Sequence, residues 1–413
     1  KVEAKPNSVY RIASISKAIT GVAVLKLVED KKLDLDSDIR NYLPSYPKKP
    51  YSFSLRQILN HTSGLRSYRD GEFNSTIRFN TTADVVRYLA ADSLEYIPGT
   101  KYLYSTLAYN LIAAIIENVS GKSFMDYMRS EIFEPAGMVS TYADYSDEII
   151  IDRVKGYVRY DDRKIKNAPF ADLTIKFPGG GFLSSVEDLL NFGIALFNGK
   201  IISQNSLNLL LETQKLNNGN TVQYGLGFAI YKDRDGKNYY GHLGGSTGFR
   251  SNFLIFPESK ITVAYLINLQ DGFLIHPWDT FKRIYLRQYV EPIKYSFQDT
   301  LFVKALNDGF EAAKTLFLNV KGGMYRNLYD FNPSVLDNTG RFLIARNKLN
   351  LAIKTYQLAV SETNESLNSL KGLAQSYYLD GNNGLSLKVF RKIGKKYPED
   401  KYSRDMIRKI LTF

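Results

Sequence analysis

Four short β-rich runs follow one another between Gln223 and Gln270, and they constrain the fold more than any other feature of this sequence. Turn residues separate the runs, among them Asp235-Gly236 and the segment Pro-Glu-Ser-Lys at 257–260. Such short connections are typical of neighbouring antiparallel strands. The sequence therefore predicts an antiparallel sheet built from Tyr224–Tyr231, Tyr239–His242, Phe249–Phe256 and Ile261–Asn268.

Helical patterns surround this sheet segment. Apolar residues predict a largely buried helix over residues 14–29 and a second over 107–120, with Gly121 as its C-cap. Pro178–Gly181 is predicted to be a glycine loop, followed by a helix that begins near Ser185 and ends near residue 198. A further helix is predicted over 278–289. Helices before and after a strand meander indicate an α/β unit with an antiparallel sheet.

Beyond about Tyr295 the pattern becomes entirely helical and contains a repeat. The two units are 34 residues apart, which is the tetratricopeptide period. Small residues there would let paired helices approach closely, and aromatic residues would fill the gap to the next pair. The positions are Gly340, Ala352, Tyr356 and Ala359 in one unit, and Ala374, Tyr377, Gly381, Phe390 and Pro398 in the next. An unrelated helical extension is the alternative, because Asn364 stands where the first unit would have its proline.

The composition excludes several kinds of chemistry. The chain has 413 residues, no cysteine and three histidines, so disulfides, thiol catalysis and thiolate metal sites are excluded. We expect neither a metal nor another cofactor. The net charge is +12, but no nucleic-acid-binding motif accompanies it, which favours a solvated basic face over a nucleic-acid partner. No stretch approaches the ~18 consecutive apolar residues of a membrane-spanning helix, so no integral membrane segment is expected.

A Ser-x-x-Lys motif, Ser14 to Lys17, stands at the start of the first predicted helix. The spacing places the serine Oγ and the lysine ammonium on one helix face, about one turn apart. The helix N-terminus favours an ionised serine and a developing oxyanion, and a partly desolvated lysine can take the serine proton. The same pattern at Ser45 and Lys48 lies among prolines that forbid a regular helix. Ser14 is therefore the candidate nucleophile and Lys17 the candidate base.

Two further segments supply groups that acyl transfer needs. Tyr104 precedes the second predicted helix, and a tyrosine near a lysine can act as a phenolate-type base or a proton relay. Packing is the alternative in a chain with 30 tyrosines. His242 is predicted to end a strand at a glycine turn, where N–H groups of Gly244 and Gly245 can face a substrate oxygen. Residues 244–248 also fit the Gly-x-Ser-x-Gly elbow of α/β-hydrolases, but a strand is predicted where that elbow needs a helix.

Together these motifs resemble the serine β-lactamase and penicillin-binding-protein superfamily, and in particular its class C-like branch. Their order is that of the family: Ser-x-x-Lys, a variant of Tyr-x-Asn, then His-x-Gly in place of Lys-Thr-Gly. Tyr10–Ala13, His61–Leu65 and Gly244–Ser251 also resemble it, so the resemblance covers residues 1 to 290. The Tyr-Ser-Thr sequence at 104–106 is most similar to the corresponding motif of the mitochondrial β-lactamase-like proteases and their bacterial relatives.

The resemblance implies a β-lactamase/transpeptidase-like α/β fold, with an antiparallel sheet flanked by helices and a helical subdomain. We assign it to residues 1–295 and the all-α, tetratricopeptide-like domain to 296–413. The family usually has two strands before the nucleophile, so N-terminal strands and any targeting segment are expected to be missing from this sequence. An exported, for example periplasmic, location is favoured by the resemblance alone.

The resemblance also implies a role for each motif residue. Ser14 would be acylated, Lys17 would be its base, and Tyr104 would share proton transfer. The backbone N–H groups of Ser14 and Gly245 would form the oxyanion hole. His242 would stand at the strand edge where substrate docks, and its charge change near pH 6.5 could tune activity.

Two departures from the family pattern bear on the substrate. Thr106 replaces an asparagine that contacts substrate amides, and His242 replaces a lysine that holds a carboxylate. Both changes argue against efficient β-lactam hydrolysis and favour a serine hydrolase acting on a small peptide, amide or ester. A β-lactamase or D-Ala-D-Ala carboxypeptidase, and an inactive module that only binds a ligand or partner, are the alternatives. The helical domain is expected to bind a protein partner or to self-associate.

Overall fold

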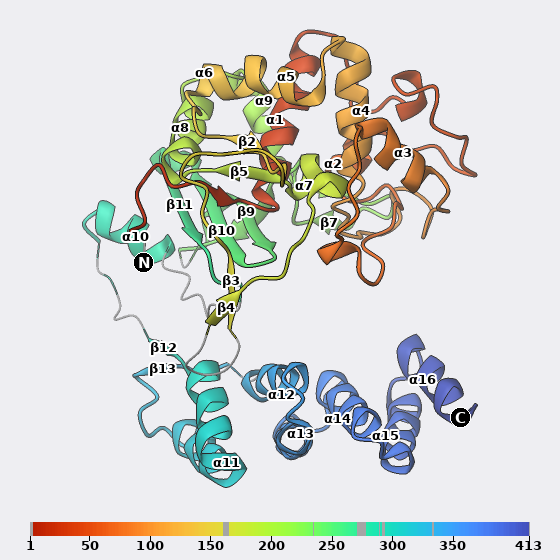
Figure 1. Cartoon of the computed structure of the whole chain (residues 1–413), viewed down its shortest axis with the longest axis vertical. Coiled ribbons are helices and arrows are strands. Elements are labelled where there is room, and N and C mark those ends of the chain that lie inside the picture. Colours follow the sequence, from red (N-terminus) through yellow and green to blue (C-terminus); the bar gives the residue numbers. More distant parts are fainter. Residues whose placement is uncertain are drawn as a thin grey trace. The chain divides into compact units, whose positions relative to one another are not determined.

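The computed structural model describes residues 3–159, 165–233, 235–270, 278–288, 290, 294–332 and 334–412. The chain divides into two compact units, one formed by residues up to 270 with 278–290 and the other by residues from 294 onward. Figure 1 shows the path of the chain through both units.

A four-stranded antiparallel sheet forms the centre of the first unit, in the order β11-β10-β9-β8. Its strands are β8 (Ala229–Lys232), β9 (Asn238–Ser246), β10 (Phe249–Phe256) and β11 (Ile261–Ile267). The predicted meander is therefore confirmed. Helix α1 (Ile15–Glu29) packs against β9 and β10, and α8 (Val186–Phe197) packs against β11 (Figure 1).

The helical part of the first unit packs beside this sheet and shares its core. It contains α2 (Leu55–Leu59), α3 (Thr82–Ala90), α4 (Tyr109–Ser120), α5 (Phe124–Met128), α6 (Glu134–Ala136), α7 (Phe177–Gly180), α9 (Gln204–Leu211) and α10 (Trp278–Tyr285). Short strands complete the unit: β1 (Tyr10–Arg11), β2 (Tyr142–Ala143), β3 (Tyr157–Arg159), β4 (Ile165–Asn167), β5 (Phe182–Ser184), β6 (Gln214–Lys215) and β7 (Thr221–Val222). The predicted antiparallel sheet flanked by helices is confirmed.

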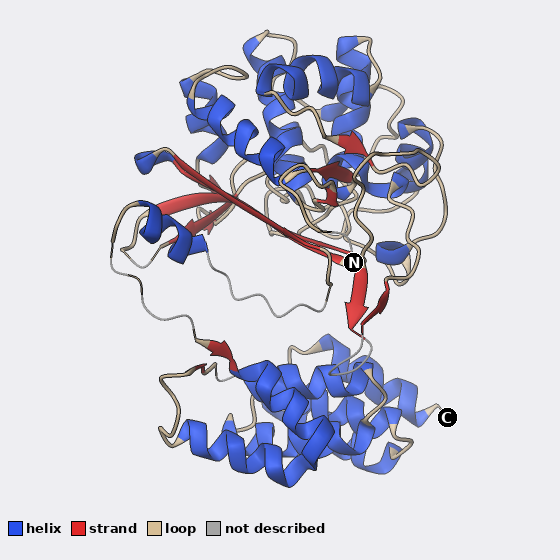
Figure 2. Ribbon diagram, turned by 60° about the vertical axis from the view of Figure 1, so that its left-hand side comes forward, coloured by secondary structure: helices blue, strands red, loops and turns tan. Residues whose placement is uncertain are grey.

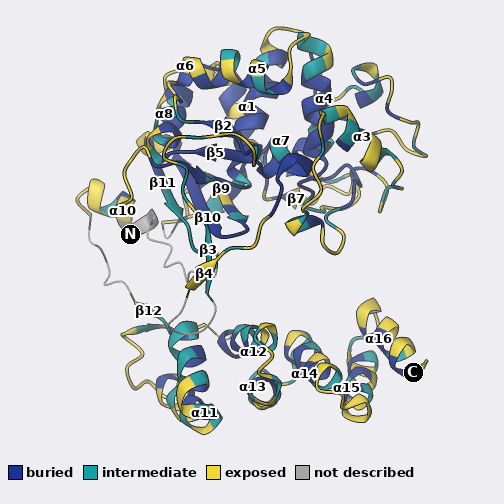
Figure 3. Cartoon of the chain, in the orientation of Figure 1, coloured by how far each residue is buried: buried dark blue, intermediate teal, exposed yellow. Residues whose placement is uncertain are grey.

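Local sequence signals explain where the main helices begin and end. Gly121 adopts a left-handed conformation (φ 69°) that ends α4 as predicted. Ser185 caps α8, its side chain accepting a hydrogen bond from the Asp188 N–H. Helix α1 is buried along nearly its whole length (Figure 3), which matches its almost continuous apolar and small residues.

Two local predictions were wrong. Pro178–Gly181 is not an open glycine loop, because Phe177–Gly180 forms a single helical turn, α7, that packs closely on Thr106. His242 does not end a strand at a glycine turn, because β9 continues to Ser246 and turns only at residues 247–248. The strand after that turn confirms that the Gly-x-Ser-x-Gly elbow is not formed.

The second unit is largely helical (Figure 2). Its elements are β12 (Tyr295–Ser296), α11 (Phe297–Lys321), β13 (Tyr329–Asp330), α12 (Val335–Ala345), α13 (Leu349–Glu362), α14 (Leu367–Leu379), α15 (Asn383–Lys396) and α16 (Lys401–Leu411). Successive helices from α11 to α16 pack on one another. The ring of Tyr356 lies where any side chain at Gly340 or Gly372 would stand, so both glycines are needed for this close packing.

Candidate active site

Ser14 stands at the N-terminus of α1 and is half-buried. Its side chain makes no capping hydrogen bond to the helix, so the hydroxyl is not engaged in holding the helix end. Ala13 before it has φ 48°, a conformation that costs a non-glycine residue free energy. The Ala13 carbonyl accepts hydrogen bonds from the Ser16 N–H and hydroxyl, at 2.9 and 2.7 Å, which hold this turn in place.

Lys17 is fully buried one turn further along α1. Its Nζ lies 2.5 Å from the Gly179 carbonyl oxygen, 3.0 Å from Thr106 Oγ1 and 3.3 Å from Ser14 Oγ. No carboxylate among the described residues pairs with it. Burial, and secondly the positive charge of Lys176, lower the pKa of Lys17 well below its usual value.

Three oxygen atoms surround Nζ and would also satisfy an ammonium group, but the lowered pKa of Lys17 favours the neutral amine. A neutral amine has two N–H donors and one lone pair, and the Gly179 carbonyl can only accept. With Gly179 and Thr106 as acceptors, the lone pair remains for the hydroxyl proton of Ser14, the most distant of the three partners. Lys17 is therefore placed to take a proton from Ser14.

Tyr104, His242 and Tyr224 form a hydrogen-bonded group beside Ser14. The His242 Nε2 lies 2.9 Å from the Tyr224 hydroxyl and 3.3 Å from the Tyr104 hydroxyl, while Nδ1 lies 2.6 Å from the Leu243 carbonyl oxygen. Because a carbonyl cannot donate, Nδ1 carries the proton and Nε2 accepts. Burial raises the pKa of Tyr104, although a hydrogen bond with Ser14 opposes this. Tyr104 is therefore a neutral phenol suited to relay a proton, not a phenolate.

The predicted charge change of His242 near pH 6.5 is wrong. Burial, and secondly the nearby Lys17, lower the pKa of His242 to about 3. The histidine is therefore neutral at every physiological pH. It cannot replace the fixed cation that its position has in Lys-Thr-Gly members of the family.

The edge of β9 lies directly beside the nucleophile. Strand β8 pairs only with residues 238–241 of β9, so within the described chain no strand pairs with that edge at 242–246. An ideal Cβ on Gly244 would lie 2.4 Å from the Ile12 carbonyl oxygen, which places this strand against the residues just before Ser14. The glycines lie within the strand and not in a turn, so Gly245 lies at an extended strand edge that no strand of the described chain covers.

The structure gives one predicted residue another contact and adds residues that the sequence did not point to. Thr106 was expected to contact substrate, and its hydroxyl accepts a hydrogen bond from Lys17. Gly179 and Tyr224 come from segments whose local pattern carries no catalytic signal. The Nδ1 of His61 accepts a hydrogen bond from the Ser105 N–H at 3.2 Å, and its ring lies 4.3 Å from that of Tyr104. His61 therefore holds the Tyr104 segment in position.

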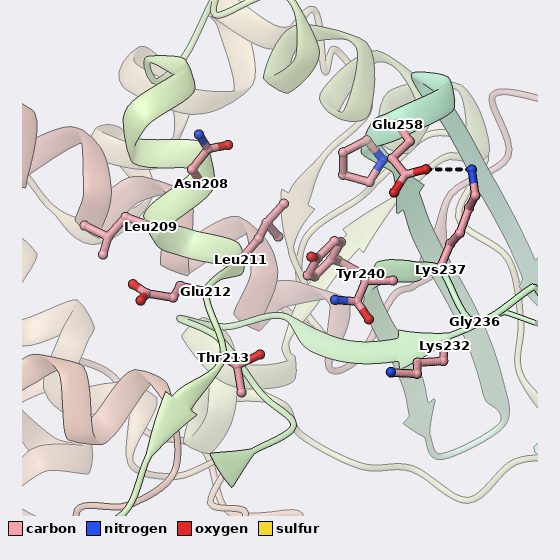
Figure 4. Close-up of a pocket in the computed structure, with 12 residues that line it drawn as sticks. Asn208, Leu209, Leu211, Glu212, Thr213, Lys232, Gly236, Lys237, Tyr240 and Glu258 are labelled. Atoms are coloured by element: carbon pink, nitrogen blue, oxygen red, sulfur yellow. Dashed lines mark ion pairs between the residues drawn. The ribbon is translucent and has the colours of Figure 1, made fainter. Parts of the chain in front are cut away.

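A pocket of about 910 Å³ lies between the end of α9 and the hairpin of β8 and β9 (Figure 4). Lys237 and Glu258 form an ion pair of 2.8 Å at its rim. None of its lining residues belongs to the Ser14 site, and no nucleophile there is paired with a base. Among the described residues no cluster of histidine and carboxylate side chains could hold a metal ion, and no helix is long and apolar enough to span a membrane.

The fold and the motif order together define a class, the serine β-lactamase-like hydrolases. A family model described as Beta-lactamase matches residues 1–279, and the chain belongs to this family.

Members of the family from a mammal and from a bacterium are similar to this chain. The serine beta-lactamase-like protein LACTB, mitochondrial, of Homo sapiens is 28% identical over 356 residues, covering 63% of this chain and 65% of that protein. Penicillin-binding protein 4* of Bacillus subtilis (strain 168) is 29% identical over 284 residues, covering 65% of this chain and 62% of that protein. The chain thus spans less than two thirds of the length of these curated relatives.

Solved structures share the fold. The D-amino acid amidase from Ochrobactrum anthropi SV3 has a TM-score of 0.58 and 25% identity, covering 66% of this chain and 81% of that chain. An octameric penicillin-binding protein homologue from Pyrococcus abyssi has a TM-score of 0.58 and 25% identity, covering 70% of this chain and 68% of that chain.

Proposed function

We propose that this protein hydrolyses a small peptide, amide or ester through an acyl-enzyme on Ser14. One observation carries the proposal. The buried Lys17 has no carboxylate partner in the described chain and lies 3.3 Å from Ser14 Oγ, with its other two hydrogen-bond partners already supplied. A lysine held in this way is neutral more readily than a surface lysine and acts as a general base.

In the proposed reaction, Lys17 takes the proton of Ser14 as Oγ attacks the substrate carbonyl. The oxyanion that forms accepts hydrogen bonds from the N–H groups of Ser14 and Gly245. The proton that Lys17 takes is passed through Tyr104 to the leaving group, so both residues are neutral in the acyl-enzyme. In the hydrolysis of the acyl-enzyme, a proton of the attacking water is passed back through Tyr104 and Lys17 to Ser14 Oγ. No metal or other cofactor is needed for this sequence of steps.

The neutral state of His242 affects which class of substrate the site favours. A β-lactam antibiotic and a D-Ala-D-Ala peptide both carry a carboxylate next to the bond that is cleaved, and the usual partner for it is a lysine. With the pKa of His242 lowered to about 3, that partner has no charge here. This favours amides and esters without a carboxylate on the leaving group over β-lactamase or carboxypeptidase activity.

A fluorophosphonate probe tests the proposal. The folded protein should be labelled at Ser14, and Ser14→Ala should abolish labelling and turnover. Lys17→Ala should lower both to a similar degree, and the double variant should be no slower than either single one, because nucleophile and base act as a unit. More than about a tenth of wild-type turnover in Ser14→Ala would move the nucleophile elsewhere. A folded protein that is not labelled would instead be a binding module.

For the helical region after Tyr295 we propose a partner-binding role. Helical repeats bury their core by stacking and present an extended surface to peptides or to a second subunit. The packing of Tyr356 between Gly340 and Gly372 supports a tetratricopeptide-like arrangement. Basic residues outnumber acidic ones from 388 to 409, which favours an acidic peptide or protein, with self-association as the alternative.

A further inference from the structure

Two tyrosine hydroxyls lie near one nitrogen lone pair beside the nucleophile. His242 Nε2 lies 2.9 Å from the Tyr224 hydroxyl and 3.3 Å from the Tyr104 hydroxyl. Because the Nδ1 proton of His242 is donated to the Leu243 carbonyl oxygen, Nε2 carries no proton and has a single lone pair. Only one hydroxyl at a time can donate to it, so a proton from Tyr224 on this lone pair leaves the proton of Tyr104 for another acceptor.

The surroundings of Tyr224 make it the donor. Its contact with Nε2 has the length of an ordinary hydrogen bond, while the contact of Tyr104 is longer and therefore weaker. Tyr224 is only 3% exposed, so its hydroxyl proton needs an acceptor within the protein. The neighbouring Tyr109 hydroxyl donates to the Leu59 carbonyl oxygen at 2.8 Å, and a phenol oxygen is a weaker base than an imidazole nitrogen. His242 Nε2 is therefore the acceptor for Tyr224.

The Tyr104 hydroxyl has other partners, at the reacting atoms. It forms hydrogen bonds with Ser14 and Thr106, and Thr106 accepts a hydrogen bond from Lys17 Nζ at 3.0 Å. In the proposed reaction Tyr104 gives its proton to the leaving group as it receives one from Lys17. A Tyr104 proton that was donated to His242 Nε2 would be unavailable to the leaving group, and this relay would stop.

We infer that Tyr224 is a positioning residue for this proton relay. Its hydroxyl occupies the lone pair of His242 and thereby leaves the proton of Tyr104 to the reacting atoms. In this role Tyr224 acts through His242 and Tyr104 and not on the substrate itself. The inference rests on the proposed function and deepens it by naming the substrates that need the relay, amides and alkyl esters, whose leaving groups depart only with a proton.

Two esters with the same acyl group test the inference. The phenolate released from 4-nitrophenyl butyrate is stable and leaves without a proton, whereas the alkoxide of ethyl butyrate must be protonated as it leaves. Tyr224→Phe removes only the hydroxyl. It should lower kcat/KM for ethyl butyrate about tenfold or more and change the value for the 4-nitrophenyl ester less than about threefold.

Tyr102→Phe is the matched control. It also removes one hydroxyl, from a ring whose centroid lies 6.2 Å from that of Tyr224. It should alter neither ester, because among the described residues the side chains that bind His242 Nε2 are those of Tyr104 and Tyr224. No loss in Tyr224→Phe, or an equal loss for both esters, would overturn the inference. A wild-type protein that cleaves the 4-nitrophenyl ester but not ethyl butyrate would also overturn it, because no relay to the leaving group would then operate.

Nitrogen NMR of isotope-labelled histidine tests the hydrogen bond without turnover. The chain has three histidines, and the Nε2 signal of His242 is identified by its disappearance in His242→Gln. This signal should move in Tyr224→Phe and stay close to its wild-type position in Tyr104→Phe. A larger movement in Tyr104→Phe would identify Tyr104 as the donor and overturn the inference. If Tyr224→Phe does not fold, the Tyr104→Phe spectrum decides by itself: an unmoved signal supports Tyr224 as the donor, and a moved signal overturns it.

Failure of the proposed function gives a different result: neither ester is cleaved and Ser14 is not labelled. The NMR comparison does not depend on turnover, so it still supports or overturns the assignment of Tyr224 as the donor to His242.

Discussion

The main chemical feature of this site is the buried amine of Lys17, which pairs with no carboxylate among the described residues. Water stabilises an ammonium ion strongly, and removal of that water favours the neutral amine. Lys17 is affected twice, because it is buried and because Lys176 adds a second positive charge nearby. Since the proposed reaction uses the neutral amine as its base, turnover should rise as the pH passes the lowered pKa of Lys17, well below the value of a surface lysine.

Thr106→Val removes the hydroxyl that accepts a hydrogen bond from Lys17 and keeps the size of the side chain. The loss leaves one N–H of the buried amine without its partner, which costs about 1 to 2 kcal/mol and corresponds to roughly a five- to thirtyfold lower kcat. Steady-state kinetics with a neutral ester measures the effect. Thr106→Ser restores a hydroxyl and should recover most of the rate; a serine variant as slow as the valine variant would contradict this role.

His242 should make the protein less stable in mild acid. Its pKa is about 3 in the folded protein and about 6.5 in the unfolded chain. Below pH 6.5 the unfolded state therefore binds a proton that the folded state does not, and the free energy of unfolding falls by about 1.4 kcal/mol for each pH unit until the folded pKa is reached. Above pH 6.5 this contribution is constant.

Urea unfolding between pH 7 and pH 4.5 measures this loss. His242→Gln, which does not titrate, should lose less stability over that range than the wild type. The buried His61 also has a pKa well below its usual value, so a smaller loss should remain in His242→Gln. Identical pH dependence in both proteins would show that His242 titrates normally.

At the scale of secondary structure, the site forms where three elements meet. The N-terminus of α1 carries Ser14 and Lys17, the single turn α7 supplies the Gly179 carbonyl, and β9 runs along the other side. Glycines at the contacts allow these elements to pack closely on their neighbours. An ideal Cβ on Gly179 would lie 2.5 Å from the Thr106 carbonyl oxygen, and one on Gly244 would lie 1.9 Å from Ser251 Oγ.

Two neighbouring glycines of β9 should respond differently to alanine. Gly244→Ala places a methyl group against Ser251 Oγ and the Ile12 carbonyl oxygen, so β9 or the start of α1 must move, at a cost of about 1 to 3 kcal/mol. Gly245→Ala meets only the far end of the Arg250 side chain, at 3.1 Å, which can shift. Thermal unfolding should show a lower Tm for Gly244→Ala than for Gly245→Ala. Equal Tm values would contradict the contact of β9 with the residues before Ser14.

At the scale of the whole molecule, each unit has its own hydrophobic core. The core of the first unit is formed by residues between Ile12 and Ile255. The second unit has clusters around Phe297 and Tyr356 and around Phe390 and Ile410. Separate cores are the usual sign of units that fold independently.

A chain that ends at residue 294 tests this independence. It should keep its cooperative unfolding transition and its labelling at Ser14, because the site and the core of the first unit lie before that residue. Light scattering of the full and shortened proteins then shows whether the second unit mediates self-association. An insoluble shortened chain would mean that the two units depend on each other, and unchanged mass together with unchanged binding of acidic peptides would contradict a partner-binding role.

The amino-acid sequence by itself determined the strand meander, the buried helix that begins at Ser14, the cap at Gly121 and the all-helical character after residue 295. Each of these depends on local periodicity or on a local turn residue, which the sequence displays directly. The Ser-x-x-Lys spacing likewise placed Lys17 beside Ser14, because the two residues share one helix face.

Only the tertiary structure decided the protonation states of the ionisable groups in the site. Whether Lys17 and His242 are charged depends on how much water surrounds them, and that depends on residues distant in the sequence, such as Thr106, Gly179 and Tyr224. The same holds for Lys176, whose pKa is lowered to about 8 by burial and by Arg11, which is distant in the sequence. Motif spacing predicts which groups meet within one element, but solvation and charge at a site are set by packing between elements.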